Sequence, residues 1–293
     1  MLTEQRNPKS MGIDQSPTLE ILQIINEEDA TIAGAIRQVL PAIAEAVDMI
    51  SERMRNGGRL FYTGAGTSGR LGILDAVECV PTFSVSPELV QGIIAGGEGA
   101  VVHSIEGAED SPEGGRDDLI ARSLTAQDAV VGIAASGRTP YVVGALNYAR
   151  QIGAGTVGIS CNAPAPVLDT ADIAIAALVG PEILTGSTRL KSGTAQKLIL
   201  NMISTTTMIK LGKVYNNLMV DVKVSNAKLA DRARRIVSEV TGLSTDEAAA
   251  LLNQTHNEVK PAIVMAVLGV SVEEARTRLD AAQGMLGAVI GQR

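Results

Sequence analysis

The segment of this chain best suited to bind an anion is a loop rich in glycine and hydroxyl residues, Thr63–Gly72. It reads Thr-Gly-Ala-Gly-Thr-Ser-Gly-Arg-Leu-Gly and lies between an apolar, strand-like run and an apolar, helix-like segment. Glycines such as Gly66 allow backbone N–H groups to come close to a ligand, and the start of a helix adds partial positive charge. The hydroxyls of Thr67 and Ser68 can donate further hydrogen bonds. This first hydroxyl loop therefore predicts a cradle for a phosphate group.

A second loop of the same kind, Ala135–Pro140, reads Ala-Ser-Gly-Arg-Thr-Pro. It follows another apolar, strand-like run, residues 129–134. Ser136 and Thr139 supply hydroxyl groups, and Arg138 supplies a cation. Two such loops in one chain indicate a phosphorylated small molecule that is held from the ends of two strands.

Two alternatives to a phosphate cradle remain open for the first hydroxyl loop. A glycine-rich turn between a strand and a helix can be only a tight connection. Gly64, Gly66 and Gly69 also form the G-x-G-x-x-G pattern of dinucleotide-binding folds. That pattern requires an acidic residue about twenty positions later, at the end of a second strand. Glu78 and Glu88 are poorly placed for this role, so an isolated phosphate is favoured over a dinucleotide.

Glu78 is the first candidate for proton transfer. It ends the helix-like segment that starts in the first hydroxyl loop, and about two helical turns, or roughly 12 Å, separate it from Arg70. Its neighbours Val77, Cys79 and Val80 are apolar. Apolar surroundings favour the protonated form that a general acid needs. The alternative is an exposed glutamate at the end of a helix.

Glu109 is the second candidate for proton transfer, and it lies in an acidic segment, Ile105–Ser111. The alternative is a solvated acidic loop. A calcium loop is not indicated, because the D-x-D-x-D-G order is missing. His103 and His256 each lack a second histidine at ligand spacing, so no metal site is expected.

A third segment, Gly180–Lys197, combines glycines and hydroxyls with Arg189, Lys191 and Lys197 just before an expected long helix. It could direct cations toward an anionic ligand, or it could cap the helix and form a contact between two copies of the chain. The residue types alone do not distinguish these possibilities.

The elements that must position these residues alternate along the chain. Strand candidates occur near residues 59–63, 89–95, 128–134, 155–160 and 172–176, with helical stretches near 70–79, 100–106, 113–122 and 138–151. This alternation predicts an α/β fold in which a mostly parallel sheet is covered by helices on both faces. Ligands bind at the carboxyl ends of the strands in such sheets, and both hydroxyl loops lie at that end.

We divide the chain into an N-terminal arm with helices, residues 1–55, an α/β domain, residues 56–240, and a small helical domain, residues 241–293. Residues 1–17 are expected to be irregular. Apolar spacing predicts helices over 18–28, 30–54, 189–213 and 226–240, and Pro41 is expected to kink or split the second of these. Capping boxes at Ser244 and Ser271 mark helix starts in the last domain.

Composition limits the partners that can be expected. The 293 residues carry a net charge of −7, which disfavours nonspecific binding to nucleic acid or to an acidic membrane. Aromatic residues make up only 2% of the chain, so stacking platforms for bases are not expected. No apolar run reaches about 18 residues, so no membrane span is expected. The two cysteines show no metal or disulfide spacing, and with no signal sequence recognisable the protein is expected to be cytoplasmic.

Taken together, these segments resemble a known family. The two hydroxyl loops resemble the phosphosugar-binding SIS (sugar isomerase) fold, a three-layer α/β/α sandwich. Five further motifs resemble the bacterial N-acetylmuramic acid 6-phosphate etherases, with the resemblance running from Leu2-Thr-Glu-Gln-Arg-Asn7 into the last helices. These motifs are Leu74-Asp-Ala-Val-Glu-Cys79, Ile94-Ala-Gly-Gly-Glu98, Glu106-Gly-Ala-Glu-Asp110, Glu182–Lys197 and Asn217-Leu-Met-Val-Asp-Val222. The resemblance also implies that the small C-terminal helical domain is similar to ubiquitin-associated (UBA) domains.

The resemblance implies cleavage of the lactyl ether of a 6-phosphosugar by elimination followed by hydration, without a metal or redox cofactor. The family's two catalytic glutamates fall on Glu78 and Glu109, the first as acid toward the departing lactate and the second as base at C2. The phosphate would be held by the two hydroxyl loops. Asn226 and Lys228 resemble a phosphosugar-contacting segment of the related glucokinase regulatory protein.

The resemblance further implies a homodimer whose sites lie near the subunit interface. Two alternatives to the lyase stay open. A noncatalytic phosphosugar sensor would share the fold without the reaction, and an aldose–ketose phosphosugar isomerase would share proton removal at C2 but release no lactate. The presence of both glutamates favours the lyase.

Overall fold

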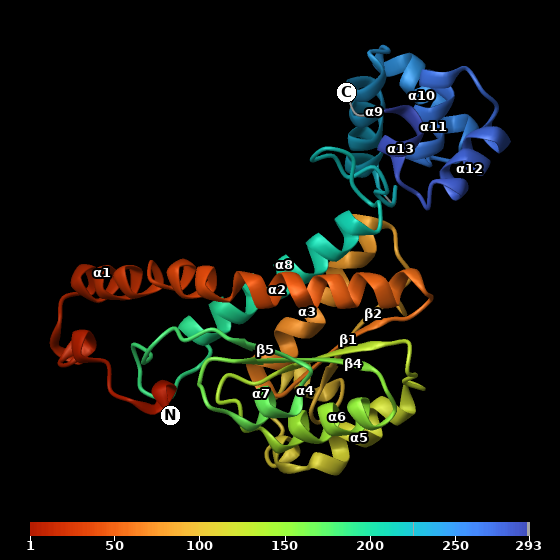
Figure 1. Ribbon diagram of the computed structural model, residues 1–293. Coiled ribbons are helices and arrows are strands. Elements are labelled where there is room, and N and C mark those ends of the chain that lie inside the picture. The colour runs from red at the N-terminus through yellow and green to blue at the C-terminus, as the bar shows by residue number, and fades with distance from the viewer. Residues whose placement is uncertain (225, 292–293) are drawn as a thin grey trace. The chain divides into compact units, whose positions relative to one another are not determined.

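All five predicted strands are present in the computed structural model, which describes residues 1–224 and 226–291, and they form one parallel sheet (Figure 1). The strands are β1 (Leu60–Gly64), β2 (Val90–Ile94), β3 (Ala129–Ile133), β4 (Gly155–Ser160) and β5 (Ile173–Ala176), in the spatial order β2-β1-β3-β4-β5. Because β1, β3 and β4 are buried along their whole length, their apolar residues occupy both faces of the sheet.

The order of the strands changes direction at β1. The chain passes from β1 to β2 on one side, then returns to β3 on the other side of β1. Such a reversal leaves a crevice at the carboxyl ends of the strands, where ligands bind in open α/β sheets. Both hydroxyl loops follow strands at this point.

Helices cover both faces of the sheet, which confirms the predicted three-layer sandwich (Figure 1). The helices of this region are α1 (Thr18–Asp29), α2 (Ile32–Arg55), α3 (Gly66–Phe83), α4 (Gly99–Val102), α5 (Pro112–Ala121), α6 (Pro140–Gln151), α7 (Pro166–Thr170) and α8 (Lys191–Lys210). The short helix α7 was not predicted. The expected split at Pro41 is wrong, because α2 continues through that residue. Residues 1–17 contain only three short 3-10 turns, as their irregular composition suggested.

By length and mean hydropathy, the stretch Thr18–Arg55 would be able to cross a membrane. It consists of two helices, however, and the apolar residues of α2 form one buried stripe that includes Ile36, Ile43 and Ile50. Helix α2 packs against β4 and β5. These contacts are those of a helix that covers the sheet of an α/β domain.

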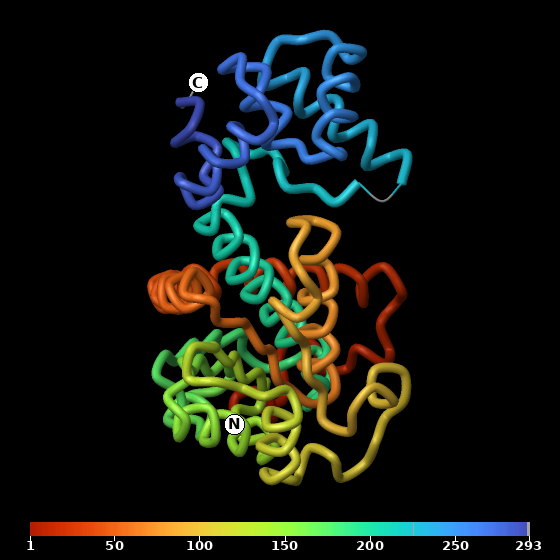
Figure 2. Tube along the Cα trace, turned by 90° about the vertical axis from the view of Figure 1, so that its right-hand side faces the viewer, coloured from red at the N-terminus to blue at the C-terminus, as the bar shows by residue number. Residues whose placement is uncertain are grey.

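The chain divides into two compact units. The first unit is Met1–Val77 with Pro87–Ser204, and the second is Glu78–Ser86 with Thr205–Arg293. Of the three boundaries along the chain, one falls within α3, one between α3 and β2, and one within α8. Figure 2 shows the chain trace from a second side, with the segment after β2 looping outward before α5.

The second unit is helical. Its helices are α9 (Ala227–Thr241), α10 (Thr245–Gln254), α11 (Val259–Leu268), α12 (Val272–Ala281) and α13 (Leu286–Ile290). They share one apolar core, to which α9 contributes Ile236 and Val237. The predicted helical domain, residues 241–293, therefore lies within a larger unit that also holds α9. The capping box at Ser244 is complete, and Ser271 accepts the expected backbone bond from Glu274.

Candidate functional site

The two hydroxyl loops lie at the same edge of the sheet, as expected. Strands β1 and β3 are neighbours, and the last residue of β1, Gly64, is opposite Ile133 of β3. Helix α3 begins only two residues after β1, at Gly66, so Thr67 and Ser68 lie in its first turn. The first N–H groups of a helix have no partner within the helix. They therefore point toward an anion placed at this edge.

Two glycines of the first hydroxyl loop are required by close packing. A Cβ on Gly69 would lie 2.6 Å from Ile94 Cγ1, and a Cβ on Gly64 would lie 2.7 Å from the Gly69 nitrogen. Gly66 has a positive φ of 52°, which side chains disfavour. The glycines thus allow α3 to start directly against the ends of β1 and β2, and they account for the G-x-G-x-x-G pattern without a dinucleotide.

In the second hydroxyl loop, the Arg138 side chain is exposed, and Ser136 and Thr139 are half-buried. The Ser136 Oγ accepts a hydrogen bond from the Arg138 backbone N–H at 3.2 Å. Helix α6 starts at Pro140, and the side chain of its N-cap residue, Thr139, forms no capping bond. Because the Thr139 hydroxyl is not used for capping and the Arg138 side chain is exposed, both remain accessible to a ligand.

Glu109 lines a cavity that also includes the first hydroxyl loop. The cavity has a volume of about 260 Å³ and is lined by residues of three segments: Ala65, Gly66 and Arg70, then Ala95 and Ala100, then His103–Glu109. Glu109 itself lies in a short 3-10 turn and is exposed. Glu109 and Gly66 of the first hydroxyl loop therefore line the same cavity. The other predicted phosphate-binding residues are not part of its lining: Thr67, Ser68, Ser136, Arg138 and Thr139.

Arg70 supports the rim of this cavity. Its Nε donates to the Val101 carbonyl at 2.8 Å, and its Nη2 donates to the Ala100 and His103 carbonyls at 2.7 and 3.3 Å. These bonds attach the first turns of α3 to the segment that leads toward Glu109. The Arg70 guanidinium therefore holds two walls of the cavity together.

Glu78 belongs to the second unit and lies on α3, ten residues after Ser68. At 1.5 Å of rise per residue, the two are separated by about 15 Å along the helix axis. The expected apolar enclosure of Glu78 is wrong for the described chain. Its side chain is exposed, and so is that of Val77, although Asp75 and Cys79 of the same helix are buried.

Asn226 and Lys228 also belong to the second unit. Asn226 is the N-cap of α9, and its Oδ1 accepts a hydrogen bond from the Leu229 N–H at 3.0 Å. Lys228 lies exposed in the first turn of the same helix. Asn226 therefore has a structural role that its sequence pattern did not predict.

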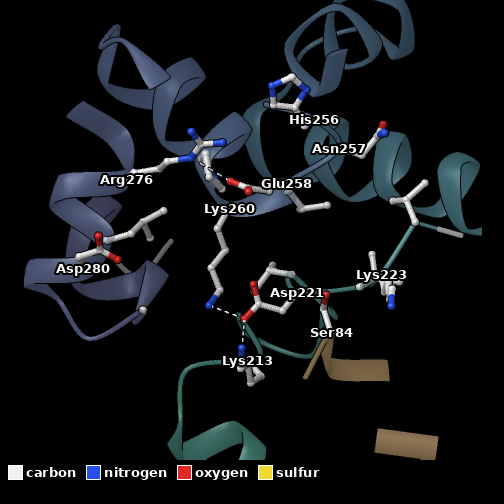
Figure 3. A pocket seen from close by; sticks show the side chains of 17 residues that line it. Ser84, Lys213, Asp221, Lys223, His256, Asn257, Glu258, Lys260, Arg276 and Asp280 are labelled. Atoms are coloured by element: carbon white, nitrogen blue, oxygen red, sulfur yellow. Dashed lines mark hydrogen bonds and ion pairs between the residues drawn. The ribbon is translucent and has the colours of Figure 1, made fainter. Parts of the chain in front are cut away.

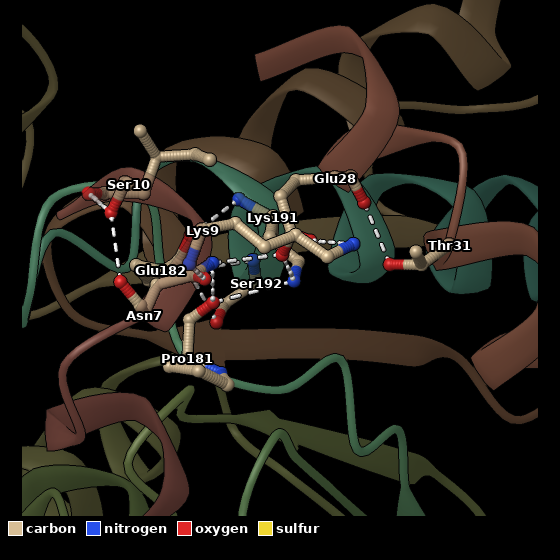
Figure 4. A network of polar contacts seen from close by, with 10 residues as sticks. Asn7, Lys9, Ser10, Glu28, Thr31, Pro181, Glu182, Lys191 and Ser192 are labelled. Carbon is tan, nitrogen blue, oxygen red and sulfur yellow. Dashed lines mark hydrogen bonds and ion pairs between the residues drawn. The ribbon is translucent and has the colours of Figure 1, made fainter. Parts of the chain in front are cut away.

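The third segment caps α8, and one of its three cations, Lys191, pairs with a carboxylate of α1 (Figure 4). The buried Glu182 carboxylate accepts bonds from the backbone N–H groups of Lys191 and Ser192 at 2.8 and 2.9 Å. The Lys191 ammonium pairs with the buried Glu28 carboxylate at 2.7 Å. The capping part of the second alternative is thus confirmed, whereas a contact between two copies of the chain stays a prediction. Lys191 also binds α1 to the start of α8.

Sequence reasoning missed two buried polar residues next to the site. Ser68 Oγ donates to Gln196 Oε1 on α8 at 2.9 Å. Asp75, on α3, accepts bonds from Asn201 Nδ2 at 2.7 Å and Ser204 Oγ at 3.1 Å. Burial raises the pKa of Asp75, although these hydrogen bonds oppose it. The only signal for Gln196 was its place in the third segment, and Asp75 had none beyond the LDAVEC motif.

The second unit has a larger cavity, of about 520 Å³ (Figure 3). Among the residues that line it are Asp221, Lys213 and Lys260, with both ammonium groups bound to Asp221 Oδ2 at 3.2 and 2.6 Å. Arg276 pairs with Glu258 at 3.1 Å on the same cavity. Its charges are therefore largely paired with one another. Across residues 1–224 and 226–291, no group of three or more His, Cys, Asp or Glu residues is close enough to hold a metal ion.

Comparison with known proteins assigns both units. The chain matches the N-terminal SIS domain of glucokinase regulatory protein over residues 42–150, the SIS domain over 111–205, and the C-terminal lid domain of glucokinase regulatory protein over 216–261. The N-acetylmuramic acid 6-phosphate etherase of Pectobacterium atrosepticum is 60% identical over 286 residues, which cover 98% of this chain and 94% of that protein. The enzyme of the same name from Salmonella typhimurium is 57% identical over 290 residues, covering 99% and 98%.

A phosphoheptose isomerase from Francisella tularensis is similar in fold. It superposes with a TM-score of 0.51 at 14% identity and covers 66% of this chain and 100% of its own. At this low sequence identity, the similarity supports the fold alone.

Proposed function

Because this chain belongs to the N-acetylmuramic acid 6-phosphate etherase family, we propose that it cleaves the D-lactyl ether of N-acetylmuramic acid 6-phosphate. The products are N-acetylglucosamine 6-phosphate and D-lactate. The reaction consumes one water in total and needs two groups that exchange protons. The observation that supports the proposal is the cavity that Glu109 lines together with Gly66, at the start of α3, because it offers a proton acceptor near the helix N-terminus where the phosphate is proposed to bind.

The mechanism begins on the ring-opened sugar, whose C1 aldehyde acidifies the proton on C2. Glu109 removes that proton, the C3–O bond breaks, and the lactate oxygen takes a proton from Glu78. A double bond now joins C2 and C3. Glu78, as a carboxylate, then takes a proton from water as the water oxygen bonds to C3, and Glu109 returns its proton to C2. Each glutamate ends in the protonation state in which it began.

The phosphate is held by the two hydroxyl loops. Thr67 and Ser68 contribute hydroxyls beside the free N–H groups of α3 and Gly66, and the second hydroxyl loop contributes from the neighbouring strand. The hydroxyls of Ser136 and Thr139, together with the exposed Arg138, would complete this part. Asn226 and Lys228 are proposed as further substrate contacts from the second unit. Fixing the phosphate fixes which sugar carbons come within reach of the glutamates.

Incubation with N-acetylmuramic acid 6-phosphate in heavy-oxygen water tests the reaction. Release of D-lactate without the label, with the label at C3 of the sugar, is expected. An absence of lactate would remove the etherase proposal, and labelled lactate would show cleavage on the other side of the oxygen. Glu78→Gln and Glu109→Gln should each lower kcat by at least about 10²-fold, as expected for loss of a general acid or base. Glu88→Gln is the matched control, since it lies outside the motifs.

A noncatalytic phosphosugar sensor remains the second candidate, because two of the matching family models are those of glucokinase regulatory protein. The same incubation separates the two proposals. A sensor would bind N-acetylglucosamine 6-phosphate and release no lactate from the etherase substrate.

We also propose that the protein is a homodimer with sites near the subunit interface. Exposed apolar pairs at helical i, i+3 spacing support this: Leu19 and Leu22 on α1 are 68% and 57% exposed, and Leu74 and Val77 on α3 are 52% and 61% exposed. Apolar side chains gathered on a surface are typical of protein interfaces. Sedimentation of the wild type and of Leu19→Lys/Leu22→Lys tests the assembly, and a wild type that sediments as a monomer would contradict it.

Mixing two inactive variants tests whether the glutamates act across the interface. In a mixed dimer of Glu78→Gln and Glu109→Gln chains, a site built from both subunits would keep both wild-type glutamates in one of its two copies. Activity should then return on mixing, to at most about a quarter of the wild-type value for random pairing. If both glutamates of a site come from one chain, every site carries one substitution and mixing restores nothing.

A cytoplasmic location is proposed as well. Both cysteines, Cys79 and Cys161, are buried free thiols. Unpaired cysteines are typical of reducing compartments. Cell fractionation tests this, and recovery with periplasmic or membrane markers would contradict it.

A further inference from the structure

Gln196, in the second turn of α8, is enclosed next to the first hydroxyl loop. The residue is 1% exposed, and its Oε1 lies 2.9 Å from Ser68 Oγ. The other half of the carboxamide, Nε2, is buried and has no hydrogen-bond partner among the described residues. Buried amide donors without an acceptor are rare in folded proteins and each calls for a physical explanation.

The backbone that carries Gln196 is held firmly. Glu182 caps the start of α8 through two backbone N–H groups. The next residue, Gly193, lies against Thr67, so closely that a Cβ would come within 3.3 Å of Thr67 Cγ2. Because the helix is fixed against the loop at this point, the group that is free to change is the terminal carboxamide of Gln196.

The direction of this carboxamide decides what Ser68 offers to a ligand. A serine hydroxyl has one hydrogen and two acceptor lone pairs. With Oε1 toward Ser68, the serine donates its hydrogen to Gln196 and keeps only lone pairs for an anion. With the carboxamide turned by 180°, Nε2 donates to Ser68 Oγ and the serine hydrogen is available to the anion. The oxygen and nitrogen ends are nearly equal in size, so the turn preserves the contact.

We propose that Gln196 is a positioning residue for phosphate binding, whose carboxamide turns so that Nε2 donates to Ser68 and Ser68 donates to the phosphate. This inference rests on the proposed function, in which Ser68 contacts the phosphate of the substrate. The turned carboxamide gives the buried Nε2 an acceptor, Ser68 Oγ. It also links α8 to the phosphate cradle, because the Gln196 Nε2 donor on α8 orients the Ser68 hydroxyl on α3.

Two substitutions of Gln196 distinguish this role from simple packing. Gln196→Glu has the same shape but presents only acceptors when ionised, so Ser68 is forced to donate to it and an added charge faces the phosphate. Gln196→Met removes both polar ends and leaves Ser68 free. At pH 8 the Kd for N-acetylglucosamine 6-phosphate should rise about tenfold in Gln196→Met and about 100-fold or more in Gln196→Glu. A packing role would give the opposite order, because Glu is the closer isostere.

The pH dependence supplies a second readout. Protonation of the introduced carboxyl group gives it an O–H that can donate to Ser68. The Kd of Gln196→Glu relative to wild type should therefore fall by about tenfold between pH 8 and pH 5.5. The wild type, measured at the same pH values, accounts for the ionisation of the phosphate ester itself. A ratio that does not change with pH would contradict the proposal.

A double-mutant cycle shows whether Gln196 acts through Ser68. In a Ser68→Ala background, Gln196→Met should have less than about a twofold further effect on the Kd, because the hydroxyl it positions is gone. If the increases in Kd caused by the two single substitutions multiply in the double variant, the proposal is wrong. Thr194→Val, an exposed position on the same helix, is the matched control and should bind like wild type. Hydrogen exchange of α8 verifies that each variant is folded.

The outcomes distinguish a failure of the positioning role from a failure of the proposed function. If the wild type binds N-acetylglucosamine 6-phosphate and both Gln196 variants bind it equally well, the positioning role is wrong and the proposed function stands. The wild type is expected to bind this sugar phosphate more tightly than unphosphorylated N-acetylglucosamine. If it does not bind the sugar phosphate, the proposed phosphate cradle is wrong, and the positioning role of Gln196 is wrong as well.

Discussion

Each of the two units contains a carboxylate that pairs with two lysines. The two clusters differ in whether burial leaves one of the charged groups destabilised. In the first unit, Glu28 pairs with Lys191 at 2.7 Å and Lys9 at 2.9 Å, and it also accepts a bond from Asn7 at 2.8 Å (Figure 4). Burial acts to raise the pKa of Glu28, but the hydrogen bonds from Lys191, Lys9 and Asn7 outweigh it and lower the pKa to about 2. The anion is therefore stabilised by its surroundings.

In the second unit, Asp221 binds both Lys213 and Lys260 through one oxygen (Figure 3). The Lys260 side chain is only 8% exposed. Burial lowers the pKa of Lys260, and the attraction of Asp221 does not fully offset it, partly because Lys213 adds repulsion. Here one carboxylate serves two cations, and the buried cation remains destabilised.

The difference predicts contributions of opposite sign at neutral pH, where Glu28 stabilises the fold and Lys260 destabilises it, although both contributions become more favourable as the pH rises, in different pH windows. Glu28 has a folded pKa below its unfolded value of 4.5, so it stabilises the first unit above about pH 4.5 and loses this effect as the pH falls through about 2. Lys260 has a folded pKa below its unfolded value of 10.5, so its charged form costs stability at neutral pH. That cost is relieved as the pH rises toward 10.5.

Removing the carboxylate of the first cluster should have the largest effect. Glu28→Gln leaves the Lys191 ammonium buried without a counter-ion, which typically costs about 3–5 kcal/mol. The loss is expected in the hydrogen-exchange protection of α8, the helix that Lys191 begins. Glu27→Gln, an exposed neighbour, is the control and should change protection by less than about 0.5 kcal/mol. Equal protection in Glu28→Gln and wild type would show that the cluster is not a stabilising one.

Acid should remove nearly the same free energy from the wild type. A shift from 4.5 to about 2 corresponds to about 3 kcal/mol of stability, which is lost mainly between pH 4.5 and pH 2. Urea unfolding at a series of pH values measures it. The curve for Glu28→Gln should lack this component, so the two proteins should converge in stability toward pH 2. Parallel curves would contradict the assignment to Glu28.

Asp221→Asn should cost less, about 2 kcal/mol, because Lys213 is partly exposed and can be solvated, and because the lowered pKa of Lys260 lets this buried group lose its proton more readily than an ordinary lysine. The expected loss is local, in the protection of α11, which carries Lys260. A loss as large as that of Glu28→Gln would mean that the two clusters are equivalent.

The smallest effect is expected for Lys260→Met. Asp221 keeps Lys213 as its partner, and a buried cation is replaced by an apolar chain of similar length, so the change should lie within about 1 kcal/mol and tend toward stabilisation. The decisive observation is the pH dependence: wild type should approach the variant in stability as the pH rises toward 10. A loss above about 2 kcal/mol would show that Lys260 is a stabilising partner after all.

Much of the fold followed from local patterns. The five strands were predicted because short apolar runs such as 129–133 alternate with helical spacing, and each was found within two residues of its expected bounds. The helix α7 was missed because its five residues, Pro166–Thr170, are too few to show a helical period. Pro41 was expected to kink or split α2, and the helix continues through this residue without a split.

The site was predicted in part. The hydroxyl loops were recognised because glycine, serine and threonine act through backbone geometry within a few residues of their own position. The exposure of Glu78 was not anticipated, since apolar neighbours in sequence, such as Val77 and Cys79, point to different sides of a helix. The function of the third segment stayed undecided until Glu182 was seen to cap α8 and Lys191 to pair with Glu28.

The amino-acid sequence by itself determined the α/β alternation, the two hydroxyl loops and the family motifs with their two glutamates. Only the tertiary structure decided which buried polar groups meet, as in the contact between Ser68 and Gln196, 128 residues apart. The reason is physical. A turn, a helix cap or a strand depends on neighbours along the chain, whereas the partner of a buried hydroxyl or carboxylate depends on which distant segments exclude water together.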